Sequence, residues 1–104
     1  MLSNHTIDVK YVIIKNMTKE LVHFTLPNST VCESMEPVIR KLLKNNPDIK
    51  YTKIDVSVEK ALYEYYARKY PLNYCPAFLG IIDGVVQDGH VGEATEMILE
   101  SLVN

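Results

Sequence analysis

The chain has 104 residues, of which 47% are hydrophobic and 23% charged, with a formal net charge of −2 at pH 7. This length suits one domain with a single core, and the composition is that of an ordinary globular protein rather than a disordered or fibrous one. The slightly negative charge offers no basic surface, so we expect neither nucleic acid nor a membrane as a partner. The sequence also lacks a signal-peptide pattern and any window long enough to span a bilayer, which predicts a cytoplasmic location.

The first twenty residues fit two patterns. Ile7, Val9, Tyr11 and Ile13 alternate as in a β-strand. Ile7, Tyr11 and Ile14 also have helical spacing. We favour the strand, although periodicity alone does not separate the two.

Residues 20–26 are rich in β-branched and aromatic side chains and end at Pro27, which predicts a buried strand. After the polar turn at residues 28–30, a helix is expected to continue to about residues 45–47. Pro37 lies inside this helix and should bend it, because proline removes a backbone hydrogen bond. The inward face of the helix is predicted to carry Val31, Met35, Val38, Ile39, Leu42 and Leu43.

Residues 49–56 alternate well enough to predict a second strand. Ser57 follows this strand and can cap a helix running from about residue 58 to residue 70. Several side chains of that segment recur at helical spacing. They are Ala61, Leu62, Tyr65, Tyr66 and Lys69.

The last third contains a predicted hairpin. Residues 76–82 form one strand, Asp83-Gly84 the two-residue turn, and residues 85–91 the antiparallel partner. Gly92 leads into a final helix. Its buried stripe is predicted to contain Ala94, Met97, Ile98, Ser101 and Leu102.

The expected order of elements is therefore strand, helix, strand, helix, hairpin, helix. Strand–helix–strand units favour right-handed parallel crossovers, and the hairpin adds an antiparallel edge. This order predicts an α/β fold with a central mixed β-sheet flanked by helices on both faces.

The two cysteines suggest sulfur chemistry. Cys32 follows a strand and a polar turn at the start of a helix, where free N–H groups favour a thiolate. Cys75 directly precedes Pro76. Two cysteines are too few for a secreted disulfide scaffold and lack the spacing of a structural zinc site. The alternative is that both are reduced, partly buried residues that act as small apolar side chains.

Taken in order, residues from about 21 to 103 resemble the thioredoxin family. The resemblance implies a single thioredoxin-like domain. It is carried by Phe24, Cys32, Pro37, Asp55, Tyr70, Cys75-Pro76, Asp83-Gly84 and Gly92.

The chain departs from the family at its catalytic motif. The family has Cys-x-x-Cys, whereas this chain has Ser29-Thr30-Val31-Cys32. A serine hydroxyl neither ionises usefully near neutral pH nor forms a disulfide, so the usual two-cysteine cycle is not available. The resemblance also places Asn28 at the position of the family's tryptophan. It places His23 at the position of a buried aspartate that assists proton transfer in the family.

The family's peptide bond before the matching proline is cis, and the residue there faces the active cysteine. The resemblance therefore places Cys75 opposite the turn that holds Ser29 and Cys32. We hypothesise a reversible disulfide between Cys32 and Cys75. His23 could relay a proton to Cys32, or simply fill space as a hydrogen-bonded histidine. Neither a metal nor another cofactor is predicted.

Two functions follow from this interpretation. The first is an atypical thiol–disulfide oxidoreductase in which Cys32, Cys75 or both exchange with a protein disulfide or glutathione. The second is a redox-inactive module that binds a protein or peptide in the groove beside Pro76. In either case Tyr74, Pro27 and Asn28 are expected to form the exposed rim with Pro76.

Overall fold

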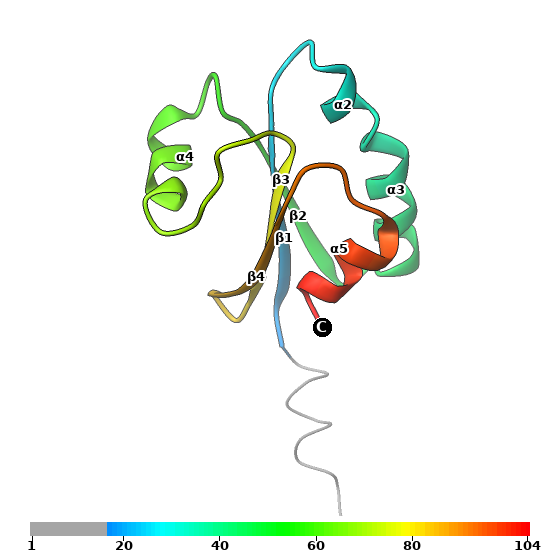
Figure 1. The fold of residues 1–104 in the computed structure, drawn as a ribbon. Coiled ribbons are helices and arrows are strands. Elements are labelled where there is room, and N and C mark those ends of the chain that lie inside the picture. The colour runs from blue at the N-terminus through cyan, green and yellow to red at the C-terminus, as the bar shows by residue number, and fades with distance from the viewer. Residues whose placement is uncertain (1–16) are drawn as a thin grey trace, which may run out of the picture.

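The computed structural model describes residues 17–104. The strand expected around residues 7–13 lies outside this range. The described chain forms one mixed four-stranded sheet with the order β2-β1-β3-β4 (Figure 1). The strands are β1 (Lys19–Thr25), β2 (Ile49–Asp55), β3 (Ala77–Ile82) and β4 (Val85–Val91).

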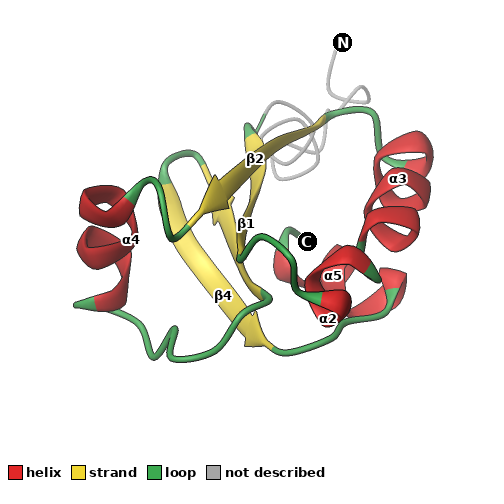
Figure 2. Cartoon of the chain, turned by 90° about the horizontal axis from the view of Figure 1, so that it is seen from above, coloured by secondary structure: helices red, strands yellow, loops and turns green. Residues whose placement is uncertain are grey.

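Helices cover both faces of the sheet, as the sequence predicts. The helix α4 (Lys60–Ala67) lies on one face, and α2 (Thr30–Glu33), α3 (Glu36–Asn45) and α5 (Glu96–Leu102) lie on the other (Figures 1 and 2). The predicted α/β fold class is confirmed.

Only one of the two strand–helix–strand units is parallel. β1 and β2 pair in parallel, from Lys19 opposite Ile49 to Thr25 opposite Asp55. β3 runs antiparallel to β1, with Ala77 opposite Phe24. The expectation of parallel crossovers is therefore wrong for the second unit. β2 ends, and β3 begins, at the end of the sheet where β1 also ends. The chain therefore does not return to the opposite end of the sheet between β2 and β3, and β3 runs antiparallel.

The helix expected after the first strand is two helices. α2 ends at Glu33, and α3 begins at Glu36 with Pro37 in its first turn. The predicted bend inside one helix is therefore wrong. A proline at the start of a helix costs no hydrogen bond, because the first-turn N–H groups have no partner within the helix. Val31, predicted to face inward, is 44% exposed because it belongs to the separate first helix.

The helix α4 is shorter than the helix predicted there, and Ser57 does not cap it. Glu59 occupies the N-cap of α4 without a side-chain hydrogen bond. Ser57 instead turns back to Asp55, whose Oδ1 accepts bonds from the Ser57 N–H at 2.9 Å and the hydroxyl at 2.6 Å. Ala61 and Leu62 are exposed, whereas Tyr66 packs against the sheet.

The buried stripe of the last helix is shifted from its predicted position. Leu99 and Leu102 are buried, whereas Met97 is 78% exposed and Ser101 is also exposed. The face that packs inward is set by contact with Gly80 of β3, where an added Cβ would meet the Leu102 carbonyl oxygen. The backbone of α5 approaches β3 so closely here that position 80 has no room for a side chain.

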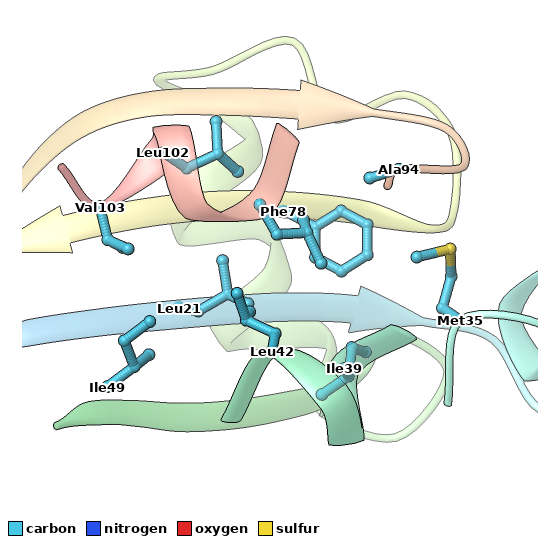
Figure 3. Close-up of a cluster of buried hydrophobic side chains, with 10 residues drawn as sticks. Leu21, Met35, Ile39, Leu42, Ile49, Phe78, Ala94, Leu102 and Val103 are labelled. Carbon is cyan, nitrogen blue, oxygen red and sulfur yellow. The ribbon is translucent and has the colours of Figure 1, made fainter. Parts of the chain in front are cut away.

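The main core fills the space between the sheet and α3 and α5 (Figure 3). Its side chains are Leu21, Met35, Ile39, Leu42, Ile49, Phe78, Ala94, Leu99, Leu102 and Val103. On the opposite face, strand residues such as Phe24 and Leu79 pack with tyrosines of and after α4. The two clusters pack both faces of the sheet from which the chain leads, after β1, into α2 with Cys32.

The predicted turn Asp83-Gly84 is confirmed. Both residues have positive φ angles, 52° and 80°, as a two-residue type I′ hairpin requires. It joins β3 to β4 with the predicted bounds of the second strand.

Candidate functional site

The site begins where β1 ends. Asn28 takes a left-handed φ of 59°, which asparagine tolerates better than most residues. This turn places Ser29 at the N-cap of α2, where its Oγ accepts a hydrogen bond from the Cys32 N–H at 3.2 Å. The Ser29 side chain therefore holds Cys32 in the first turn of the helix, as an N-cap does.

A hollow of about 380 Å³ lies beside Cys32. It forms because β1 and β2 are parallel, so that their last residues, Thr25 and Asp55, lie side by side. The chain therefore leaves both strands at the same end of the sheet. Its walls are Thr25, Leu26, Pro27, Asn28, Cys32, Glu33, Glu36, Lys53, Asp55 and Glu59.

Four carboxylates and one lysine ring this hollow. The Lys53 Nζ lies 3.2 Å from Glu36 Oε2, in an ion pair whose two side chains are both partly exposed. The remaining carboxylates are those of Glu33, Asp55 and Glu59. Hydrogen bonds from Ser57 hold the pKa of Asp55 below its usual value, so this group is anionic at neutral pH.

The Cys32 residue is only 3% exposed. Burial by itself raises the pKa of this thiol, but hydrogen bonding by the Ser29 side chain opposes burial. Further hydrogen bonds from the Leu26 backbone and the Thr25 side chain, with the charge of Lys53, bring the pKa of Cys32 below its ordinary value. The surroundings of Cys32 thus favour the thiolate.

The surroundings of Cys75 have the opposite effect. Burial raises the pKa of its thiol, and the negative charges of Cys32 and Asp55 raise it further. The Cys75-Pro76 peptide bond is cis, as the resemblance implies. Both cysteines are free thiols, so the disulfide hypothesised between them is not present in the structure.

The residues near the cis bond form a second region. Tyr74 is 70% exposed, and its place on the rim of a groove stays a prediction. The Pro76 ring is fully buried, so it does not present a surface itself. Neither Tyr74, Cys75 nor Pro76 lines the hollow beside Cys32, whereas Pro27 and Asn28 do.

His23 is fully buried inside β1. Its Nδ1 lies 2.8 Å from the Tyr51 hydroxyl, and its ring stacks on Phe78 at a centroid distance of 4.6 Å. Burial and the charge of Lys53 lower the pKa of His23 to about 4. The imidazole is therefore uncharged at neutral pH, and its hydrogen-bond partner is Tyr51 rather than Cys32. The proton-relay role stays a prediction that this environment does not favour.

Sequence reasoning missed several groups around Cys32. Glu33 and Glu36 follow the motif within a few residues, and Lys53 and Asp55 lie at the end of the neighbouring parallel strand. The available signal was the parallel pairing of the two strands, which places their carboxyl ends at one edge. Among residues 17–104, no group of three or more His, Cys, Asp or Glu side chains could hold a metal ion. None of the helices described for this chain is long and apolar enough to cross a membrane.

No protein-family model and no curated protein matches this chain. Solved thioredoxin structures do match. Mitochondrial thioredoxin 3 of Saccharomyces cerevisiae, in its oxidized form, is 23% identical, with a TM-score of 0.70 over 89% of this chain and 84% of that one. Thioredoxin of Fasciola hepatica is 23% identical, with a TM-score of 0.71 over 91% of this chain and 88% of that one.

A mutant thioredoxin from Halobacterium salinarum NRC-1 is 25% identical, with a TM-score of 0.69 over 93% of this chain and 84% of that one. The chain therefore has the thioredoxin-like fold. At these identities the likeness shows the fold alone, and the Ser-x-x-Cys motif of this chain has to be interpreted from its own geometry.

Proposed function

We propose that this protein is a thioredoxin-like thiol–disulfide exchange protein that works with one thiol, that of Cys32. The observation that carries the proposal is the hydrogen-bonded setting of Cys32, which lowers the pKa of its thiol although the side chain is buried. A thiolate is the species that attacks disulfides, so this setting supports nucleophilic chemistry.

The proposed reaction consists of two successive exchanges, and in each of them one S–S bond forms while another breaks. The Cys32 thiolate attacks one sulfur of a partner disulfide that enters the hollow. The partner's S–S bond breaks, a mixed disulfide forms on Cys32, and the other partner sulfur leaves as a thiolate. A second thiol from the partner or from solution then releases Cys32 in the same way, so no other oxidant is needed.

Ser29 is a positioning residue in this scheme. Its Oγ holds the first turn of α2 and supports the Cys32 thiolate, whereas a second cysteine there would form the family's usual disulfide. Cys75 is the weaker candidate, because burial and neighbouring negative charges raise the pKa of its thiol.

The test is exchange with hydroxyethyl disulfide, a small uncharged compound, followed by mass spectrometry of the modified cysteine. We expect a mixed disulfide on Cys32 in the wild type and in Cys75→Ser, and none in Cys32→Ser. Exchange that persists in Cys32→Ser and disappears in Cys75→Ser would move the chemistry to Cys75. No exchange in any of the three proteins would end the proposal.

A second candidate function is binding of an extended peptide in the groove beside Pro76 without redox turnover. The exposed Tyr74 favours it, because an aromatic side chain that is 70% exposed two residues before the buried Pro76 offers an anchor for a partner. Titration of cysteine-free extended peptides into the Cys32→Ser/Cys75→Ser protein would test it. We expect chemical shift changes at residues 73–77 that disappear in Tyr74→Ala. Peptides that leave these resonances unmoved would contradict it.

A further inference from the structure

We infer that the hollow beside Cys32 selects disulfides that carry a positive charge close to the sulfur and rejects anionic disulfides such as oxidised glutathione. This inference rests on the proposed function, because it names the substrate class of the same site. The shared chemistry is an ammonium or guanidinium group a few bonds from a disulfide.

The charges around the hollow support this choice. Four carboxylates and a single lysine line it, so its formal charge is strongly negative. The lysine, Lys53, is already paired with Glu36 at 3.2 Å, and this is the only ion pair among residues 17–104 that reaches the hollow. The carboxylates of Glu33, Asp55 and Glu59 form no ion pair within the described residues and can attract a cationic group that enters the hollow.

The position of the thiol brings a substrate that enters the hollow close to these charges. Cys32 is 3% exposed and is one of the residues that line the hollow. A disulfide that reaches the sulfur along this route must pass the carboxylates. Clefts lined by one sign of charge concentrate ligands of the opposite sign and speed their association.

The thiolate of Cys32 is favoured even with these carboxylates around the hollow. Hydrogen bonds from Ser29, Leu26 and Thr25 outweigh burial and keep the pKa of Cys32 low despite the acidic rim. The site thus combines a supported thiolate with an entrance that attracts cations. The hollow, at about 380 Å³, has room for a small aminothiol disulfide or for a lysine or arginine side chain beside a cysteine.

The experiment compares three small disulfides at low salt: cystamine, which is cationic, hydroxyethyl disulfide, which is uncharged, and oxidised glutathione, which is anionic. Each rate of mixed-disulfide formation on Cys32 is divided by the rate of the same compound with a free reference thiol, which removes differences in leaving group. We expect cystamine to react about tenfold faster than the uncharged compound and oxidised glutathione about tenfold slower. Both differences should shrink in 1 M salt, where charges are screened within about 3 Å.

Variants connect the selectivity to the hollow. Glu33→Gln/Glu59→Gln should bring the three normalised rates closer together. Glu64→Gln/Glu100→Gln removes the same number of charges outside the hollow and should leave the order and spacing of the rates intact. Two peptides distinguish a protein substrate from a small aminothiol. Each has a cysteine in a mixed disulfide, which is flanked by Arg in one peptide and by Glu in the other. A gain from Arg that exceeds the gain from cystamine assigns the site to a basic segment of a protein.

The failures of the two proposals are distinguishable. Equal normalised rates for all three disulfides, or the fastest rate for oxidised glutathione, would overturn the charge selectivity while leaving one-thiol exchange in place. Failure of Cys32 to react even with the uncharged disulfide would overturn the proposed function, and this inference with it. Salt dependence provides the same test without any variant.

Discussion

Cys32 is buried and Cys75 is partly buried, and yet the pKa values of their thiols are shifted in opposite directions. Burial raises the pKa of each. Around Cys32, hydrogen bonds from Ser29 and from the end of β1 outweigh burial, whereas around Cys75 the further influences are negative charges. The difference teaches that burial decides the charge state of an ionisable group only where no hydrogen bond supports the charged form.

His23 extends the comparison to a group that becomes cationic. Burial is the main cause that lowers its pKa, and the charge of Lys53 acts in the same direction. Its Nδ1 contacts the Tyr51 hydroxyl, and its Nε2 is buried without a partner among the described residues. Burial therefore keeps it neutral, and three predictions follow from this contrast between supported and unsupported groups.

The largest expected effect is acid destabilisation through His23. The folded pKa is about 4, below the ordinary 6.5, so the unfolded chain binds the proton more readily between these values. The stabilising contribution is complete above pH 6.5 and is lost as the pH falls towards 4. The whole interval corresponds to about 3 kcal/mol of unfolding free energy, measurable by urea denaturation at several pH values.

The control for this prediction is His23→Gln, which cannot titrate. Its unfolding free energy should depend less on pH between 6.5 and 4 than that of the wild type. An equal slope in both proteins would mean that other groups cause the loss, and that His23 is not held neutral by burial.

An intermediate effect is expected from Ser29→Ala. Loss of the N-cap should cost about 1 kcal/mol of stability, and the pKa of Cys32 should rise towards the range of Cys75 because its largest hydrogen-bond support is gone. The rate of alkylation by iodoacetamide against pH, measured in a Cys75→Ser background, reports the pKa.

Thr95→Ala is the matched control, since Thr95 caps α5 with a side-chain bond to the Ile98 N–H at 3.2 Å. It should lose similar stability without moving the alkylation profile of Cys32. A Cys32 profile that is the same in Ser29→Ala and Thr95→Ala would show that Ser29 acts only as a structural cap.

The smallest effect is expected from Lys53→Gln. Lys53 lowers the pKa of both His23 and Cys32, so both pKa values should rise when its charge is removed. Stability should change by less than about 1 kcal/mol, because the pair with Glu36 is partly exposed to solvent. NMR titration of His23 and the alkylation profile of Cys32 provide the two readouts.

Lys41→Gln serves as the comparison here, because Lys41 pairs with Glu96 at 3.9 Å, away from both groups. It should leave the two pKa values in place. If Lys41→Gln shifts them as much as Lys53→Gln does, the effect is a general one of net charge and not one of position.

Much of the fold follows from local sequence. Alternating side chains and the Asp83-Gly84 turn predict the strands, because period-two patterning and positive φ angles are local properties. Helix details are less local. Pro37 begins a helix instead of bending one, and the buried stripe of α5 is shifted, since its orientation depends on the close contact between Leu102 and Gly80.

The candidate site divides in the same way. The sequence by itself determined that Ser29 and Cys32 share a helix start, because residues three apart at an N-cap meet within one turn. Only the tertiary structure decided that Lys53, Asp55 and Glu59 line the same hollow as Cys32, and that His23 contacts Tyr51. Those contacts depend on the parallel pairing of β1 and β2, which places residues thirty positions apart opposite each other. The charge state of a buried group depends on all such neighbours together, and for this reason it cannot be obtained from the chain order alone.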